Sequence, residues 1–476
     1  MKVLFVTSEA LPFIKTGGLG DVSGALPAAL SRLGLDVRVV LPLYSNIAES
    51  MRKKLRFVTS FYIHNSWRKQ YCGVFEADID GVKYYLIDNE YYYKRPSIYG
   101  DYDDGERFAY FCRAVMELMG QVDFIPDILH LNDWQTAFCS VLLRAQYAMR
   151  PGYALIKSVY TIHNIEFQGK YDPYILGDVF GLGEYDKPLL YYGDCINLSK
   201  GAIECSHAVT TVSPTYAAEI QDPYYAFGLE DILKARSFKL HGILNGIDTK
   251  LYNPETDPKI KVKYSFKTRG LKRHNRAALL QKAGLGDSGM PVIGMVSRLT
   301  HQKGLDLLIE RMDWMMGLGF RLIVLGTGDK EYTDALESAA WRHGGMCFWN
   351  RFDDGLARMI YAGCDFFLMP SKYEPCGLSQ MIALRYGTPP IARLCGGLRD
   401  TVFGFDSQSG TGNGITFFGF DGDDFASAIW RAGELFDDKA AYSLCRKNAM
   451  SGDYSWDKSA KQYRDLYFSL MAMPIL

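Results

Sequence analysis

Short apolar segments alternate with helical patterns along nearly the whole chain. Residues 2–6, 36–42 and 82–88 are rich in Val, Leu, Ile and Tyr and have the length of buried strands. The stretches 104–120 and 134–148 carry apolar residues at helical spacing. Near-continuous apolar strands separated by helices favour a parallel sheet that is covered on both faces.

The second half of the chain repeats this alternation. Residues 291–299, 321–329 and 365–371 are typical of strands, and residues 354–364 and 377–387 are typical of helices. A chain of 476 residues is too long for one compact core. We therefore expect an α/β protein with two Rossmann-like, doubly wound domains.

The best candidate for a domain boundary is the segment 244–260. It contains the breakers Asn-Gly, Asn-Pro and Asp-Pro. We predict an N-terminal domain over residues 1–244 and a C-terminal domain over 245–458. The last segment, 459–476, has helical apolar spacing and is expected to pack back on the first domain.

Composition narrows the possible partners and the compartment. The net charge of −1 offers no general attraction to nucleic acid or to an anionic membrane, so we expect neither as a partner. The ten cysteines form no C-x-x-C pair, which fits a reducing compartment. The first apolar stretch is too short for a signal peptide, and no run approaches a membrane span. We expect a cytoplasmic protein.

A glycine-rich loop follows the first strand directly. Its sequence, KTGGLGDV, places Lys15 beside glycines that stand just before a helix. Such glycines let a backbone come close to a phosphate, and the helix start offers free N–H groups. A tight turn with a solvated lysine explains the loop equally well. A dinucleotide fingerprint fails because Ser23 stands where its last glycine should be, and no G-K-[ST] marks a P-loop.

The loop resembles the signature of bacterial glycogen synthases and plant starch synthases. The other segments that resemble this family occur in order: RPSIYGDYDDGERFAYF, NDWQTAF, TIHNIEFQG, LNGIDTKLYNPETD, SRLTHQKGLDLL, KYEPCGLSQMIALRYGTPPI and GGLRDTV. These are retaining glycosyltransferases of the GT-B type. The resemblance implies two facing Rossmann-like domains with a deep cleft between them.

The resemblance implies transfer of glucose from ADP-glucose to the non-reducing end of an α-1,4-glucan, such as glycogen or a maltooligosaccharide primer, with retention of configuration. A UDP-glucose-using synthase or a small-sugar transferase is the enzymatic alternative. Ile382 stands where related small-sugar enzymes often have a second glutamate, which counts against the latter. A catalytically inactive glucan-binding scaffold is the non-enzymatic alternative.

The resemblance also implies which residues bind the donor and carry the reaction. Fixed cations near the departing diphosphate would stabilise the transition state more than the ground state. The alternative is that Arg298 and Lys303 are ordinary solvated cations of a loop and do not act on the diphosphate. The expected donor-binding residues are Lys15, Gly17, Gly18, Asp21, Asn245, Arg298, Lys303, Glu374, Cys376, Gly377 and Leu378. The expected catalytic residues are Lys15, His163, Arg298, Lys303 and Glu374.

Acceptor residues are implied in the N-terminal half. The resemblance implies that His163 faces the sugar. Asn132 stands where bacterial relatives often have a histidine, which is a departure from the family pattern. Asp133 could orient a sugar or cap the following helix. The tyrosines at 91–93 could stack on sugars or pack as a strand. The expected acceptor-binding residues are Glu9, Tyr93, Asp133 and Trp134.

No metal and no other cofactor is expected. Two Asp-x-Asp patterns, at 78–80 and 101–103, resemble the manganese motif of other glycosyltransferases. The pair Asp80-Gly81 lies between two strand-like segments and predicts a hairpin turn instead. We interpret both patterns as structural.

Overall fold

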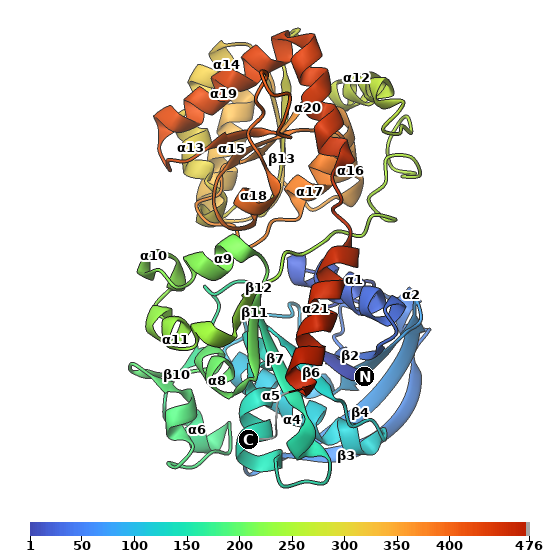
Figure 1. Ribbon diagram of the computed structural model, residues 1–476, viewed down its shortest axis with the longest axis vertical. Helices are drawn as coiled ribbons and strands as arrows, with labels where there is room; N and C mark the ends of the chain where they lie inside the picture. Colours follow the sequence, from blue (N-terminus) through green and yellow to red (C-terminus); the bar gives the residue numbers. More distant parts are fainter. Residues whose placement is uncertain (473–476) are drawn as a thin grey trace. The chain divides into compact units, whose positions relative to one another are not determined.

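The computed structural model describes residues 1–472, which form two compact units (Figure 1). The first unit comprises residues 1–245 together with the segment that begins at Trp456, and the second comprises residues 246–455. Each unit is an α/β structure built on a mainly or wholly parallel sheet. The predicted two-domain α/β architecture is thus confirmed.

The first unit contains a nine-stranded sheet of order β12-β11-β7-β6-β1-β2-β5-β4-β3. The strands are β1 (Lys2–Val6), β2 (Asp36–Pro42), β3 (Arg56–Asn65), β4 (Arg68–Ile79), β5 (Val82–Asp88), β6 (Ile128–Asn132), β7 (Lys157–Ile162), β11 (Ala208–Thr211) and β12 (Leu240–Gly242). The strands from β12 to β5 pair in parallel. The central strands β6 and β7 are buried along their whole length, as their continuous apolar runs require.

Strands β3 and β4 extend this sheet as an antiparallel edge. Only Asp80 and Gly81 connect β4 to β5, and their φ angles are 50° and 78°. Two central residues at positive φ are what a tight type I′ hairpin turn needs. The predicted hairpin is therefore confirmed, and the carboxylate of Asp80 belongs to a turn.

Helices cover both faces of this sheet. The larger ones are α1 (Gly18–Arg32), α4 (Asp104–Gln121), α5 (Trp134–Leu142), α8 (Leu198–Cys205) and α21 (Trp456–Met471). Helix α5 packs against α4 and α8, whereas α1 packs against α21 (Figure 1). The crossovers β1-α1-β2 and β6-α5-β7 run in opposite directions along the sheet, so right-handed connections place α1 and α5 on opposite faces.

The strand order of the first unit reverses between β1 and β6. From β1 the chain proceeds to β2 and β5 on one side, and from β6 to β7 and β11 on the other. Helices diverge at such a reversal and leave a crevice outside the carboxyl ends of the strands, where α/β proteins bind ligands. The loops that follow β1, β6 and β7 all lie at this edge.

The second unit has the same plan. Its six parallel strands, in the order β15-β14-β13-β16-β17-β18, are β13 (Val292–Val296), β14 (Arg321–Leu325), β15 (Met346–Trp349), β16 (Phe366–Met369), β17 (Pro390–Arg393) and β18 (Ile415–Phe417). The order reverses between β13 and β16. Candidate residues after these two strands are thus brought to one edge of the sheet.

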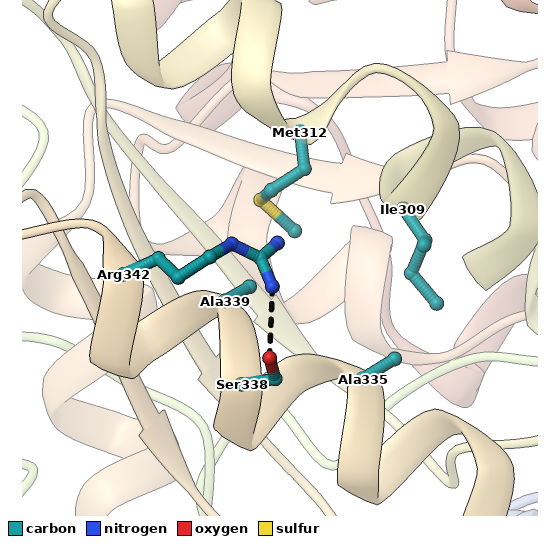
Figure 2. Close-up of a pocket in the computed structure, with 6 residues that line it drawn as sticks. All are labelled: Ile309, Met312, Ala335, Ser338, Ala339 and Arg342. Carbon is teal, nitrogen blue, oxygen red and sulfur yellow. Dashed lines mark hydrogen bonds between the residues drawn. The ribbon is translucent and has the colours of Figure 1, made fainter.

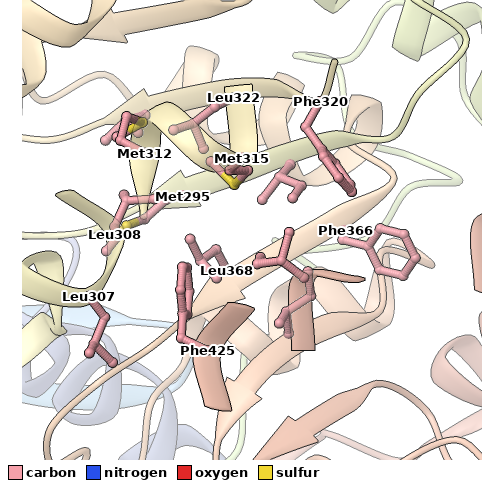
Figure 3. Close-up of a cluster of buried hydrophobic side chains, with 14 of the residues drawn as sticks. Met295, Leu307, Leu308, Met312, Met315, Phe320, Leu322, Phe366, Leu368 and Phe425 are labelled. Atoms are coloured by element: carbon pink, nitrogen blue, oxygen red, sulfur yellow. The ribbon is translucent and has the colours of Figure 1, made fainter. Parts of the chain in front are cut away.

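A large apolar cluster of the second unit forms on one face of its sheet (Figure 3). Helices α13 (Leu305–Glu310), α14 (Met312–Gly317), α15 (Lys330–Arg342) and α19 (Gly422–Asp437) contribute apolar side chains that meet the strands. Leu308, Met315, Phe425 and Leu368 of β16 are fully buried members of this cluster. This packing fixes the strand ends from which the candidate site projects.

A buried polar chain ties α21 to the sheet of the first unit. The His130 ring, on β6, hydrogen-bonds through Nδ1 to the Tyr467 hydroxyl and through Nε2 to Thr161 Oγ1, each at 2.6 Å. Thr161 Oγ1 in turn contacts Thr210 Oγ1 at 2.6 Å. Complete burial lowers the pKa of His130 to about 3, because no solvent stabilises the charged ring.

Acidification should therefore destabilise the first unit. His130 has a lowered folded-state pKa, so its neutral form contributes full stability above the unfolded pKa near 6.5, and this is lost as pH falls toward 3. Between pH 7 and pH 5 the loss from this ring should be about 2 kcal/mol. Urea unfolding of a His130→Gln variant should show a smaller pH dependence than the wild type.

The exposed His64 provides the matched control, since His64→Gln should retain the wild-type pH dependence. Replacement of His130 removes hydrogen bonds at both pH values, so the difference between pH 7 and pH 5 is the relevant quantity. An equal pH dependence in the wild type and in His130→Gln would contradict a neutral His130 in the folded protein.

Candidate functional site

The glycine loop of the first unit is held by a buried carboxylate. Glu9, which is 3% exposed, accepts hydrogen bonds from the backbone N–H of Thr16 at 2.5 Å and of Gly17 at 3.3 Å. The hydroxyls of Thr16 and Tyr99 also donate to it. Burial raises the pKa of Glu9, and these donors oppose that shift. Glu9 thus fixes the backbone directly before α1.

Lys15 lies against the start of α1 because Gly20 has no side chain. A Cβ at Gly20 would lie 2.9 Å from Lys15 Cβ and 3.1 Å from Lys15 Cα. The Lys15 ammonium pairs with Asp21, with Nζ–O distances of 2.6 and 2.8 Å. The loop therefore brings together Lys15, Gly17, Gly18 and Asp21, and at least one of its glycines serves packing.

Asp133 and His163 follow the adjacent strands β6 and β7. Asp133 Oδ1 accepts the backbone N–H of His163 at 2.8 Å. The Asp133 backbone has φ 57° and ψ 177°, a strained conformation for a residue with a side chain. Its carboxylate accepts no capping hydrogen bond from α5. The alternative role of Asp133, as a helix cap, is therefore not observed.

Burial shifts the pKa of both side chains. It raises the pKa of Asp133 to about 7, since desolvation outweighs the backbone N–H groups of His163 and Asn164. It lowers the pKa of His163 to about 3. At neutral pH the His163 ring is therefore uncharged, and Asp133 lies near the midpoint of its titration. Groups with such shifted pKa values at a sheet edge are typical of functional sites.

The remaining acceptor candidates are more deeply buried. Trp134, the first residue of α5, is 9% exposed and packs edge-on against Phe108. Tyr93 is 1% exposed, with its ring against Tyr44 and Tyr110, and therefore lies in the core. Tyr91 is exposed. The tyrosines also form a short helix, α3 (Glu90–Tyr93), and not a strand.

In the second unit, Lys303 and Glu374 form a partly buried ion pair. Lys303 Nζ lies 2.7 and 2.9 Å from the two carboxylate oxygens of Glu374, and Ser371 Oγ donates to the same carboxylate at 2.9 Å. Lys303 follows β13 and Glu374 follows β16, the two strands at the reversal of order. The sheet thus joins residues that are 71 positions apart in the sequence.

Gly304 makes the close approach between these two loops possible. Its φ is +69°, and a Cβ there would lie 1.9 Å from the carbonyl oxygen of Pro370, which directly follows β16. Only glycine fits such a position without a backbone shift. The backbone that carries Lys303 is therefore held beside the segment that carries Ser371 and Glu374.

The other donor candidates follow the same two strands in the sequence or lie at the end of the first unit. Arg298, beyond β13, is exposed. Cys376 is 5% exposed, and Gly377, at φ +72°, and Leu378 directly precede α17 (Ser379–Arg385). Asn245 is buried at the end of the first unit, and its side-chain oxygen has no hydrogen-bond partner within the described residues.

The second Asp-x-Asp pattern is bound by arginines. Asp101 pairs with Arg107 at 3.0 Å, and Asp103 pairs with Arg95 at 2.8 Å. Among residues 1–472, no group of three or more His, Cys, Asp or Glu side chains has the arrangement of a metal site. Over the same residues, no helix is both long and apolar enough to cross a membrane.

A small pocket opens elsewhere in the second unit, between α13, α14 and α15 (Figure 2). Its one charged lining residue, Arg342, donates to Ser338 Oγ at 2.8 Å. None of the predicted site residues lines it. Its lining consists of Ile309, Met312, Ala335, Ser338, Ala339 and Arg342.

Sequence patterns missed several supporting residues. Thr16 and Ser371 donate to the two buried glutamates, but a lone hydroxyl residue in a loop carries no sequence signal for such a role. In the sequence, Asn132 differs from the histidine that is common in bacterial relatives, and nothing else marks it. Its contacts show that it binds the His163 ring.

Comparisons with known proteins agree with this architecture. The family "Starch synthase catalytic domain" matches residues 2–235, and "Glycosyl transferases group 1" matches residues 290–433. A glycogen synthase from Anoxybacillus flavithermus is 47% identical over 99% of this chain and 98% of its own length. One from Clostridium beijerinckii is 48% identical, with 99% of both chains covered.

Solved structures extend the comparison. The catalytic domain of starch synthase IV from Arabidopsis thaliana, bound to ADP and acarbose, superposes with a TM-score of 0.92 and 35% identity over 99% of both chains. A sucrose-phosphate synthase from Thermosynechococcus elongatus shares the fold, with a TM-score of 0.63 and 17% identity over 99% of both chains.

The fold and these similarities define the chain as a retaining glycosyltransferase of the GT-B type. Its nearly complete overlap with curated relatives at 47–48% identity narrows that class. The chain belongs to the glycogen synthase and starch synthase family.

The close approach at Gly304 can be tested by substitution. Gly304→Ala must move the backbone away from Pro370, and should lower the stability of the second unit by about 2 kcal/mol or more. For a unit of this size that corresponds to roughly 4–8 °C in calorimetry. Gly317→Ala is the matched control, because nothing lies within 4 Å of its added Cβ. Equal melting of both variants and the wild type would contradict the close approach.

Proposed function

We propose that this protein transfers glucose from ADP-glucose to the non-reducing end of an α-1,4-glucan, with retention of the anomeric configuration. The observation that supports this most strongly is the full-length similarity to glycogen synthases combined with the Lys303–Glu374 pair at the strand-order reversal. The Arabidopsis starch synthase, which is similar over the whole chain, was solved with ADP and acarbose.

The chemistry assigns a role to the cations of both units. As the glycosidic bond of the donor breaks, negative charge develops on the departing diphosphate. We propose that Lys15 of the first unit and Arg298 and Lys303 of the second stabilise this charge, with no metal ion taking part. Their positive charge is worth most in the transition state, where the leaving group carries more charge than in the bound donor.

Both lysines are held ready by carboxylates. The Lys15–Asp21 and Lys303–Glu374 contacts fix each ammonium group before any anion is present. A fixed cation needs less reorganisation when the diphosphate arrives. We propose that Glu374 also binds hydroxyls of the transferred glucose, since its carboxylate has capacity for further donors.

The first unit would bind the sugar and the acceptor. We propose that His163 faces the anomeric centre and that Asp133 orients the glucose or the acceptor hydroxyl. The exposed Tyr91 is a better candidate for stacking on a glucan than the buried Tyr93. No disulfide joins any of the ten cysteines, all of which lie within the described residues, and this supports a reducing compartment such as the cytoplasm.

Loss of either lysine should slow the transfer. Lys15→Ala and Lys303→Ala should each reduce kcat about 10²–10³-fold, because each removes a donor to the developing negative charge. Incorporation of radiolabelled glucose into glycogen measures the effect. Lys267→Ala, an exposed lysine of the second unit, should retain wild-type turnover. Near-wild-type turnover of both site variants would contradict the proposed role of the cations.

A donor panel tests the choice of nucleotide sugar. With glycogen as acceptor, ADP-glucose should support faster chain growth than UDP-glucose at equal concentration, as expected for a relative of ADP-bound starch synthase. Quantification of the released nucleoside diphosphate gives the rates. Faster growth from UDP-glucose would favour the alternative donor. Glycogen binding without growth from either donor would favour a glucan-binding scaffold.

A further inference from the structure

Asn132, the last residue of β6, is fully enclosed and makes two hydrogen bonds. It is 1% exposed. Its Nδ2 donates to the carbonyl oxygen of Val6 at 2.9 Å, and its Oδ1 lies 3.0 Å from Nε2 of His163. The side chain thus connects the end of β1 to the ring of the proposed site histidine.

The partner on β1 determines how the amide must point. The Val6 carbonyl can only accept a hydrogen bond, so it requires the NH₂ group of Asn132. The amide oxygen is then the atom that faces His163. An amide oxygen also only accepts, and the His163 ring must therefore donate through Nε2–H. The proton position on the ring follows from the chain of contacts.

The His163 ring is also held through its backbone. Its backbone N–H donates at 2.8 Å to Oδ1 of Asp133, the residue that follows Asn132 in the sequence. Three charged or titratable groups influence this region: Asp133, Glu9 and His130. Glu9 acts by raising the pKa of Asp133. A neutral ring with a proton on Nε2 carries its lone pair on Nδ1.

We propose that Asn132 is a positioning residue that fixes His163 as the Nε2–H tautomer, so that Nδ1 is left as the hydrogen-bond acceptor toward a sugar hydroxyl. This role rests on the proposed function, because it assigns His163 to the sugar-binding site. Asn132 acts only through His163 and touches no reacting atom. A ring with the other tautomer would offer a donor where the site requires an acceptor.

Three substitutions separate this role from simple packing. Asn132→Leu has a similar volume but removes the acceptor for Nε2–H. Asn132→Asp replaces the donor to Val6 with a second acceptor and favours a charged His163. Asn132→His restores one donor and one acceptor, since neutral imidazole has both. A purely structural role would not order these variants by hydrogen-bonding capacity.

The first measurement is nitrogen NMR of the wild-type protein labelled with ¹⁵N-histidine. Long-range proton–nitrogen correlations distinguish the two tautomers, and the spectrum of His163→Gln assigns the signal among the eight histidines. We expect a neutral Nε2–H ring from pH 6 to pH 9. An Nδ1–H tautomer, or a charged ring at pH 7, would overturn the proposal, and this test needs neither a folded Asn132 variant nor activity.

The second measurement is the pH profile of transfer from ADP-glucose to glycogen. Asn132→Leu should lower kcat about tenfold or more with little change in the donor KM, as expected when a ring loses its correct tautomer. Asn132→His should restore most of the loss. Asn132→Asp should lose additional activity as pH falls, because its carboxylate raises the pKa of His163. Wild-type kcat in Asn132→Leu would overturn the positioning role.

These results also separate the two hypotheses. If the wild-type protein transfers no glucose but its His163 is a neutral Nε2–H ring, the proposed function fails and the tautomer assignment stands. If transfer is normal but the tautomer is Nδ1–H, the positioning role fails and the proposed function stands.

Discussion

The reversal of strand order in each parallel sheet is the constraint on which the rest of the structure depends. Between β1 and β6, and again between β13 and β16, neighbouring connections leave in opposite directions, the arrangement that in α/β proteins forms a crevice beyond the carboxyl ends of the strands. Lys15, His163, Lys303 and Glu374 all follow strands at or next to these reversals. The continuous apolar strands place their carboxyl ends at one edge of the sheet. Polar residues that directly follow these strands in the sequence therefore lie at that edge.

Buried carboxylates give these strand ends a defined geometry. Glu9 holds the backbone N–H groups before α1, and Glu374 holds the Lys303 ammonium. Asn132 performs the same task for His163 with a neutral amide. These contacts thus give the candidate site residues defined positions.

The sequence predicted the alternating elements, the Asp80-Gly81 hairpin and the residues that follow the central strands, because buried apolar runs and turn residues are local signals. It missed β3, whose residues are mostly exposed, and β15, which is only half buried. It also missed helix α3, although the Asn89 side chain caps it at Tyr92. The contact of Lys303 with Glu374, and the unusual backbone of Asp133, depend on distant residues and have no local signature.

The central proposal is that Lys15, Arg298 and Lys303 act on one departing diphosphate. A crystal structure of the protein with ADP and a maltooligosaccharide tests it most directly. The account predicts that Lys15 Nζ, Lys303 Nζ and the Arg298 guanidinium lie within about 2.7–3.2 Å of diphosphate oxygens. A diphosphate bound away from Lys15, or bound only through a metal ion, would contradict it.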